Sequence, residues 1–381
     1  MAFLSNFSWS NLRGRGGSPD YIMAICLAFI ILFGLMMLSS ASSDLGQVEY
    51  GDTYYFFKSQ IVKGILLGGL AFLFFYLIDY RVTKKMSLVF LIISLILLLL
   101  IFTPLGQEKK GAARWVDLGF LELQPSELVK FAFIIYLASW LSGREGVGRR
   151  GKFLEGFLPF LVISGIISGL LILQPATSVV VIVMIPALTI YFVGGGRISY
   201  MVGAGVAGLL ILTMLVMATP FRRERVAGFY DFLKGEGDTR GAAFHLNQAL
   251  ITIGSGGLWG VGYGNSINKT KHLPEPIGDS IFAVIAEEFG FVGGVILIGV
   301  FYLFILRGLI NAYKAENDFV KFTLIGFSTL IGIQVFIHIG ANSALVPLTG
   351  VPLPFVSYGS TAMVVFLSMA GLMLNMSRGV K

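Results

Sequence analysis

Long apolar runs recur along the chain from one end to the other, separated by polar stretches. Most runs approach the roughly 20 residues that a helix needs to cross a bilayer, and most polar stretches are too short for a separate globular domain. The pattern predicts an all-α polytopic membrane protein, a bundle of ten transmembrane helices. The expected helices cover residues 21–42, 61–77, 87–102, 126–141, 157–173, 177–193, 199–218, 279–306, 322–341 and a last run that ends near Asn375.

One polar stretch, residues 219–278, is much longer than the others. Loops beyond about 15 residues without structure of their own are usually functional or disordered. Its segment FHLNQALITIG has Leu246, Leu250 and Ile253 at helical spacing and is too short to span a membrane. We therefore expect a short amphipathic helix in this loop, lying at the membrane surface or re-entering it.

Composition supports the membrane assignment and limits other functions. Of the 381 residues, 56% are hydrophobic and 13% are charged, against about 25% charged in soluble domains. The net charge of +7 fits cytoplasmic loops that face anionic lipid better than it fits nucleic-acid binding. The single cysteine, Cys26, lies in an apolar run, which excludes an intrachain disulfide and a cysteine metal cluster.

The lysine and arginine residues of the short loops indicate the orientation of the chain. They are concentrated on the side of the two termini, which places that side in the cytoplasm. The first apolar run is too long for the core of a signal peptide, so we expect it to remain as a helix. The expected organisation is a cytoplasmic tail (residues 1–20), a membrane domain (21–376) whose long loop (219–278) faces outward, and a cytoplasmic C-terminal tail (377–381).

The stretch LPEPIGDSIFAVIAEEFG, residues 273–290, contains the acidic residues to which we assign the chemistry. Asp279 stands at the expected start of a helix, where it could cap the helix, act as a general base toward a sugar hydroxyl, or do both. Glu287 and Glu288 follow about two turns deeper, where carboxylates are costly. Because adjacent helical residues point about 100° apart, at most one of them can face the cavity of Asp279. The alternative is a buried acid that pairs with a lysine elsewhere in the bundle.

Two further pairs combine charge with an apolar setting. Glu127 and Lys130 are three residues apart on a predicted helix, where they would form an ion pair that locks the bundle or would contact a substrate directly. Arg114 and Trp115 occur in the loop KKGAARWVDLG, which faces outward like the long loop. The tryptophan could be a membrane anchor, whereas arginine beside tryptophan can also bind phosphate and stack on a sugar.

The long loop adds basic residues that suggest an anionic lipid head group as ligand, with solvated surface charge as the alternative. The glycine-rich stretch 254–264 has no GK[ST] motif after it, so we expect close backbone approach rather than a nucleotide loop. His245, His272 and His338 are too scattered for a metal site. No cofactor is evident, although a divalent cation is left open. The basic residues are Arg222, Arg223, Arg225, Lys269 and Lys271.

Four motifs resemble the SEDS family (shape, elongation, division and sporulation). They are GAARWVDLGFLELQPSELVKFA, FHLNQALITIGSGGLWGVGYGNS, LPEPIGDSIFAVIAEEFG and PLTGVPLPFVSYGST, and they stand in the family's order. The resemblance extends over nearly the whole chain. The GYGNS segment and the LPEP turn are more similar to the cell-division branch, FtsW, than to the elongation branch, RodA.

The resemblance implies a ten-helix bundle that polymerises lipid II into peptidoglycan strands at the outer face of the bacterial cytoplasmic membrane, in septal cell-wall synthesis. It implies Asp279 as the essential loop aspartate, Glu127 and Lys130 as the helix pair, and Arg114 and Trp115 as the loop pair. The expected partners are a class B penicillin-binding protein, other division proteins and membrane lipid, with no nucleic acid. We expect substrate contacts from Arg114, Trp115, Lys269, Lys271, Glu275 and Ser357, and support from Glu287 and Glu288.

The chain departs from the family pattern at three places. Gln174-Pro175-Ala176 stands where the family usually has QPD, His338 stands in place of an asparagine, and Ser280 follows Asp279 where a phenylalanine is usual. The alternatives to a septal polymerase are a transporter that flips lipid II, a scaffold for division proteins, or a polymerase of the elongation type. We see no inverted repeat, and the polar groups gather on one face, which favours surface chemistry over transport. Without a placed second carboxylate we expect inversion at the anomeric carbon.

Overall fold

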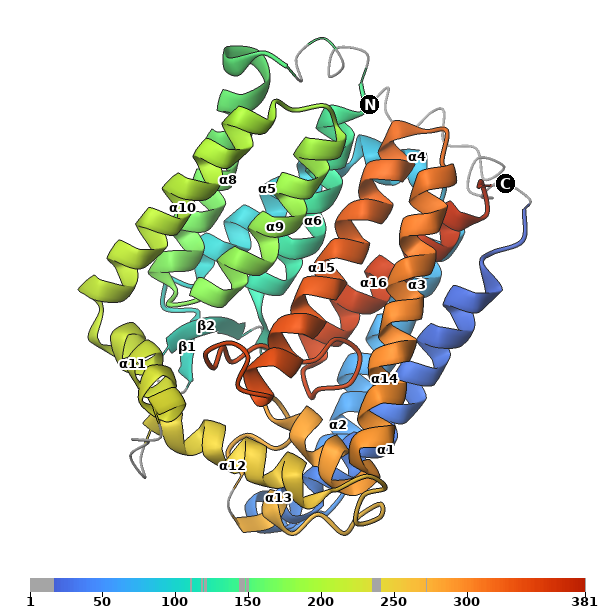
Figure 1. Ribbon diagram of the computed structural model, residues 1–381. Helices are drawn as coiled ribbons and strands as arrows, with labels where there is room; N and C mark the ends of the chain where they lie inside the picture. Colours follow the sequence, from blue (N-terminus) through green and yellow to red (C-terminus); the bar gives the residue numbers. More distant parts are fainter. Residues whose placement is uncertain are drawn as a thin grey trace.

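The computed structural model describes residues 17–109, 112–117, 119, 122–143, 148, 151–234, 241–271 and 273–380. These residues form a bundle of long helices, with a small sheet and the helices of the long loop at one end (Figure 1). Seven of the described helical stretches are long and apolar enough to cross a membrane. The polytopic helical membrane fold is therefore confirmed, while the number of ten spans stays a prediction. The seven stretches are α1 (Tyr21–Tyr50), α2 to α3 (Tyr55–Leu77), η3 to α8 (Phe153–Leu173), α10 (Ile198–Ala218), α14 (Ile281–Lys314), α15 (Asp318–Asn342) and α16 (Ser360–Ser377).

Four further helices complete the bundle, and two of the long stretches contain a π-helical turn. The two shorter apolar helices, α5 and α9, lie close to the expected limits. The bounds are α4 (Tyr80–Lys85), α5 (Ser87–Leu100), α6 (Pro125–Leu141) and α9 (Thr177–Val193). The composite stretches are α2 (Tyr55–Ser59), η2 (Gln60–Leu66) and α3 (Leu67–Leu77), and η3 (Phe153–Phe157) and α8 (Leu158–Leu173).

Helix ends differ more from expectation than helix positions do. α1 continues to Tyr50, beyond the end expected at residue 42, and stops where Gly51 adopts φ 67° and its N–H bonds to the Gln47 and Gly46 carbonyls. Hydropathy marks where a helix leaves the apolar layer, whereas the left-handed glycine marks where the helix itself ends. α14 likewise continues beyond the end expected at residue 306, to Lys314, where Ala315 turns to an extended conformation.

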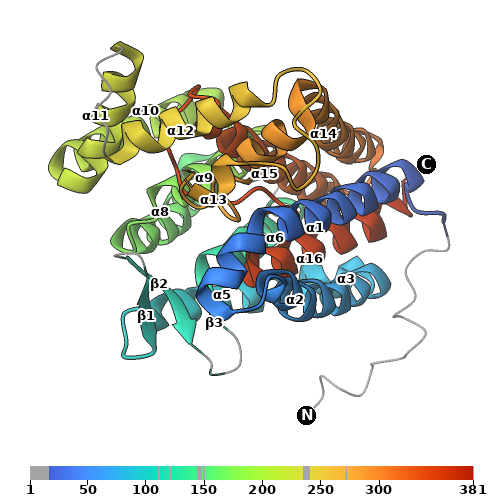
Figure 2. The same ribbon diagram turned by 90° about the horizontal axis from the view of Figure 1, so that it is seen from below.

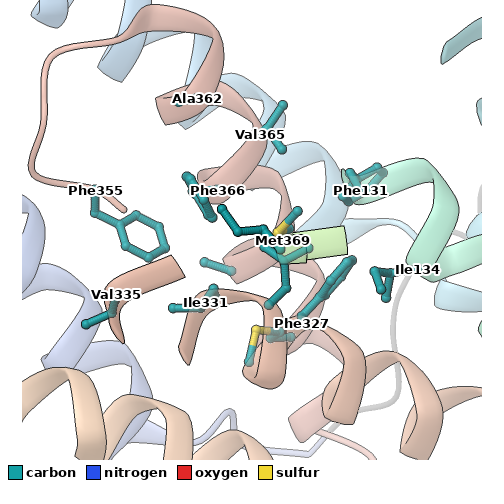
Figure 3. Close-up of a cluster of buried hydrophobic side chains, with 14 of the residues drawn as sticks. Phe131, Ile134, Phe327, Ile331, Val335, Phe355, Ala362, Val365, Phe366 and Met369 are labelled. Atoms are coloured by element: carbon teal, nitrogen blue, oxygen red, sulfur yellow. The ribbon is translucent and has the colours of Figure 1, made fainter. Parts of the chain in front are cut away.

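The core of the bundle lies between α15, α16 and α6. Phe327 and Ile331 of α15 meet Phe366 of α16 and Phe131 of α6 (Figure 3), and the rings of Phe131 and Phe327 stack with centroids 5.6 Å apart. α15 also packs against α14 and α9, and α16 packs against α3. By contrast α10 has no buried residue, which fits a helix surrounded by lipid.

A three-stranded antiparallel sheet replaces the polar loop expected before α6. Its strands are β1 (Gly106–Lys109), β2 (Ala112–Asp117) and β3 (Glu122–Leu123), in the order β1-β2-β3. The hydroxyl of Thr361, in the first turn of α16, donates to the Glu122 carbonyl at 3.1 Å and accepts from the Gln124 N–H at 3.2 Å. The sheet is therefore fixed to the bundle, and it presents Arg114 from a strand rather than from a flexible loop.

The long loop is mostly helical in its described part. α12 (Gly241–Ser255) is the amphipathic helix that the sequence predicts, whereas α11 (Pro220–Lys234) is not predicted by it. A short helix, α13 (Asn268–Lys271), follows. α11 and α12 lie across one end of the bundle (Figures 1 and 2). The start of α1 and the end of α16 meet at the other end, where the Asp20 N–H bonds to the Ser377 hydroxyl at 3.0 Å.

α14 is broken at Gly290, which has φ 68° and ψ −169°. The break frees two carbonyl groups and two N–H groups, and the glycine-rich loop takes up all four. The carbonyls of Glu287 and Glu288 accept from the N–H groups of residues 261 and 262, both at 3.0 Å. The N–H groups of residues 291 and 292 donate to the carbonyls of residues 257 and 258, at 2.9 and 3.2 Å. A Cβ at Gly260 would collide with the Glu288 carbonyl, which confirms the close backbone approach expected of this stretch.

We predict that Gly290→Ala destabilises the fold, because this backbone conformation alone costs a non-glycine residue about 1–3 kcal/mol and the new Cβ would lie 2.5 Å from the Leu258 carbonyl oxygen. Gly299→Ala is the matched control in the same helix, where an added Cβ meets nothing within 4 Å. It should be neutral or stabilising by about 0.5–1 kcal/mol. Thermal unfolding in detergent measures both, and equal midpoints would contradict the role given to the break.

Candidate active site

A small pocket lies where the sheet, the bundle and the long loop meet. Its walls come from β2, α6, the first turn of α9, α11 and the segment 349–352 that follows α15. Two arginines, an acid and a lysine contribute charge to it. The lining residues are Arg114, Gln124, Glu127, Lys130, Pro175, Ala176, Thr177, Ser178, Val179, Arg225, Thr349, Gly350, Val351 and Pro352.

The two arginines make one side of the pocket cationic. Arg114 donates to the backbone carbonyls of Gln174 at 3.3 Å and Pro175 at 2.6 Å, which joins β2 to the turn between α8 and α9. Burial lowers the pKa of Arg114, the charge of Arg225 lowers it further, and Asp279 opposes both effects. Burial likewise lowers the pKa of Arg225 against the influence of Asp279. A guanidinium stays charged despite such shifts, so two cations and the Asp279 carboxylate act on one another across this region.

Asp279 borders the pocket at Gly350. A Cβ added to Gly350, which has φ 65°, would lie 3.3 Å from Oδ2 of Asp279. The prediction that Asp279 could cap the helix was wrong, because Ser280 occupies the N-cap position and α14 begins at Ile281. The half-buried Asp279 therefore precedes the helix by two residues and belongs to the turn that leads into it.

One face of α15 holds this wall of the site. Gln334, His338 and Asn342 are spaced by four residues, so they lie on one helical face. The Gln334 amide donates to the Pro352 carbonyl at 2.9 Å, and Nδ1 of His338 donates to the Val351 carbonyl at 2.7 Å. The Asn342 amide donates to the Asp279 carbonyl at 2.9 Å. The segment 349–352 and the backbone of Asp279 are thus hydrogen-bonded to the same helix, α15.

Glu127 and Lys130 form the ion pair that their spacing predicts. The Lys130 ammonium lies 2.7 Å from Oε1 of Glu127 and donates to Oε1 of Gln334 at 2.8 Å. Both charged side chains are almost fully buried and line the pocket floor. Oε2 of Glu127 is buried and has no hydrogen-bond partner among the described residues.

Glu287 and Glu288 lie in a separate polar cluster beneath the long loop. Glu287 accepts hydrogen bonds from Ser255, Ser266 and Asn268. Glu288 pairs with Lys269 at 2.9 Å and accepts from the Ser40 hydroxyl of α1 at 2.5 Å. The alternative interpretation, a buried acid paired with a lysine, is therefore confirmed for Glu288.

The other residues predicted to contact the substrate lie in different parts of the structure. Lys269 uses its ammonium on Glu288, Ser40 and the Gly264 carbonyl, so it lies in the buried cluster. Ser357 donates to the Gly278 carbonyl at 2.8 Å and accepts from the Leu353 N–H, so it holds the Asp279 turn. Trp115 is half-buried and pairs with Gln107 in the sheet.

Glu275 has φ 50°, and its carbonyl accepts from the N–H groups of Gly278 and Ser280, which closes the turn before Asp279. The side chain of Lys271 and the whole of His272 lie outside the described residues. Substrate contact by any of these residues stays a prediction. Within the described ranges no group of three or more His, Cys, Asp or Glu side chains could hold a metal ion.

Sequence reasoning missed Gln334 and Asn342, and it did not single out Arg225 from the other basic residues of the long loop. Arg225 is one of several cations in the long loop, and nothing in its spacing separates it from its neighbours. Gln334 and Asn342 do not belong to any motif singled out above. Amide side chains within an apolar run are nevertheless a usable signal, since a membrane span buries such groups only with partners.

Comparison with known proteins agrees with this arrangement. A family model described as cell cycle protein, covering FtsW, RodA and SpoVE, matches residues 20–381. The chain belongs to this family. Stage V sporulation protein E of Bacillus subtilis is 34% identical over 95% of this chain and 97% of its own length. A probable peptidoglycan glycosyltransferase FtsW of Coxiella burnetii is 34% identical over 98% of both chains.

Solved structures of FtsW/RodA/SpoVE-like chains have the same fold. A chain from a peptidoglycan synthase complex, described as coordinating polymerization and crosslinking, has a TM-score of 0.75, 26% identity and coverage of 94% of this chain and 98% of its own. The rod shape determining protein RodA of Thermus thermophilus has a TM-score of 0.69, 26% identity and coverage of 94% and 97%.

The buried Lys269–Glu288 pair gives a stability prediction. Removing one partner, in Lys269→Met or Glu288→Gln, leaves the other group buried without its full complement of partners and should cost about 3–5 kcal/mol. The double variant should lose less than the sum of the two. The control is Lys58→Met, which removes an exposed pair with Asp52 (side chains 64% and 39% exposed) and should leave the unfolding midpoint nearly unchanged, because solvent screens such pairs. Thermal unfolding in detergent tests this, and additive losses would argue against coupling.

Proposed function

We propose that the chain is a peptidoglycan glycosyltransferase that polymerises lipid II into glycan strands at the outer face of the bacterial cytoplasmic membrane, in septal wall synthesis. The observation that supports this most directly is the Asp279 carboxylate at the edge of a pocket that Arg114 and Arg225 line. The relatives named peptidoglycan glycosyltransferase, at 34% identity over nearly the whole chain, support the same activity.

The chemistry needs one base and several cations. Lipid II carries its sugar on a pyrophosphate, which is already a good leaving group. Asp279 accepts the proton of an acceptor sugar hydroxyl, the hydroxyl oxygen forms the new bond to the anomeric carbon of the donor, and the bond from that carbon to the pyrophosphate oxygen breaks. This single displacement inverts the anomeric configuration, because no covalent glycosyl-enzyme is formed.

Arg114 and Arg225 neutralise the charge that grows on the departing pyrophosphate. Fixed cations aimed at developing charge are the usual source of such stabilisation, and guanidinium groups match phosphate oxygens in geometry. Glu127, which lines the pocket, is a further candidate for contact with a sugar hydroxyl or amide. Trp115, Glu275, Lys271 and a divalent cation are further candidates for substrate contact.

The partner we propose is a class B penicillin-binding protein, which supplies the transpeptidase, together with other division proteins. Support comes from the structural neighbour, whose description concerns polymerization and crosslinking by one complex. The proposed topology has both termini in the cytoplasm, because the charged short loops lie on their side of the membrane and the pocket lies near the other end of the bundle.

The first prediction of this proposal concerns the base. Asp279→Asn keeps the shape of the side chain but removes its basicity, so glycan-strand synthesis from purified lipid II should fall at least about a hundredfold, within the range that a general base contributes. The assay uses the protein in vesicles, with and without a cognate penicillin-binding protein whose own active site is blocked. If wild type and variant both made polymer, the chain would still be a polymerase, but Asp279 would not be its general base.

Other outcomes of the same assay separate the alternatives. A flippase would show no polymer from wild type but would move fluorescent lipid II across vesicles, with little effect of Asp279→Asn. A scaffold would do neither while still binding its partner. Polymer from wild type alone is the result that we expect.

The second prediction concerns the leaving group. Arg225→Gln should lower kcat/KM about 10- to 100-fold, the loss expected when a hydrogen bond to a charged group worth about 1.5–3 kcal/mol is removed. Arg223→Gln is the matched control, since it removes the same charge from an exposed position on the same helix. Initial rates over a range of lipid II concentrations measure both. Equal effects of the two variants would reduce Arg225 to a general surface charge.

A further inference from the structure

The turn that carries Asp279 is held from the side of the long loop by a histidine. Nε2 of His245, on α12, lies 2.7 Å from the Ser280 hydroxyl oxygen, and that hydroxyl donates to the Pro274 carbonyl at 2.7 Å. A hydroxyl has one proton, and here the Pro274 carbonyl accepts it. Nε2 of His245 is therefore the donor to Ser280, which fixes the histidine as the tautomer protonated at Nε2.

Ser280 stands at the start of α14 but does not cap the helix with its side chain. It is the N-cap residue of α14, and serine is among the preferred N-cap residues because its hydroxyl can bind the free N–H groups of the first turn. Its side chain makes no capping hydrogen bond. The hydroxyl instead closes the turn from Pro274 to Ser280 and accepts from His245. Ser280 is fully buried, so loss of the donor would leave an oxygen without water to replace it.

α12 presents His245 in a fixed direction. Leu246 and Ala249 of this helix are buried, at 1% and 0% exposure, whereas Asn247 is exposed. Burial lowers the pKa of His245, the charge of Glu275 opposes this, and Arg225 lowers it again. The imidazole is therefore neutral at neutral pH and carries a single N–H, the one that Ser280 receives.

The bonds to the Asp279 turn come from two sides of it. Asn342 and Ser357, from the membrane bundle, bind the carbonyls of Asp279 and Gly278. His245, from the long loop, binds the residue that immediately follows Asp279. The turn is thus held from the bundle and from the long loop, and loss of the His245 bond would remove the attachment to α12 that this hydrogen bond provides.

We propose that His245 is a positioning residue for Asp279, and that its hydrogen bond to Ser280 sets the direction of the carboxylate toward the pocket. The inference rests on the proposed function for its kinetic consequence, although the restraint on the turn does not depend on any activity. His245 touches neither reacting group. It acts through Ser280, the residue that follows Asp279.

The first experiment measures the restraint without any substrate. Amide hydrogen exchange of the segment 273–281 is compared in detergent for wild type, His245→Leu, His245→Gln and Asn247→Leu. His245→Leu should raise the exchange rate about two- to tenfold, the change expected when a hydrogen bond of typical net strength is lost. His245→Gln keeps an N–H donor and should restore much of the protection. Asn247→Leu, on the exposed side of the same helix, should leave it unchanged.

The second experiment measures polymerisation. His245→Leu should lower kcat about tenfold and leave the KM for lipid II nearly unchanged, because Arg114 and Arg225 are untouched. His245→Gln should recover most of the rate. Ser280→Ala removes the bond to His245 together with the bond to Pro274, so it should lower kcat at least as much as His245→Leu. The double variant should be no worse than Ser280→Ala, since the bond to His245 is already lost there.

Several results would overturn the proposal. One is that His245→Leu has the exchange rate and the kcat of wild type. Another is that His245→Gln recovers no more protection or activity than His245→Leu. A third is that the losses in kcat of the two single variants multiply in the double variant. If His245→Leu does not fold, His245→Gln and Ser280→Ala still decide by the same comparison. If wild type makes no polymer, the proposed function fails while the exchange data still decide whether His245 restrains the turn.

Discussion

The structure depends on the constraint that every backbone N–H and carbonyl group that a helix releases away from water needs a partner within the protein. The break in α14 at Gly290 meets this requirement by exchanging four hydrogen bonds with the glycine-rich loop. In a continuous helix these four groups would bind one another, and none would be left for the loop. The break therefore allows a short helix to begin at Ile281, and with it the turn of Asp279 to lie at the level of the pocket.

The site is assembled from segments that are far apart in the chain. Arg114 comes from a strand, Arg225 from α11, the Glu127–Lys130 pair from α6, and Asp279 from the turn before α14. The cations of the site are compensated locally, by backbone carbonyls for the half-buried Arg114 and by Glu127 and Gln334 around the buried Lys130. The polar groups can therefore lie next to an apolar core without the cost of an unpaired buried charge.

The sequence predicted the helices and the main acidic residues, because long apolar runs and isolated charges within them are compatible with few structures besides a membrane bundle with buried polar sites. It did not predict the sheet, α11 or the break at Gly290, since each depends on contacts between distant segments rather than on local periodicity. The helix-capping role considered for Asp279 failed by one residue, a difference that hydropathy cannot resolve. The partner of Glu288 could be named only as some lysine, because the fold, not the spacing, selects Lys269.

The polar face of α15 fixes more than hydrogen bonds. Gln334 and Asn342 are eight residues apart, which at a rise of about 1.5 Å per residue separates their backbones by about 12 Å along the axis. One of them binds the Pro352 carbonyl and the other the Asp279 carbonyl. The length of α15 between these two residues therefore sets the distance between the pocket wall and the Asp279 backbone. A single residue inserted between Gln334 and Asn342 would change this distance and rotate one amide away from its carbonyl.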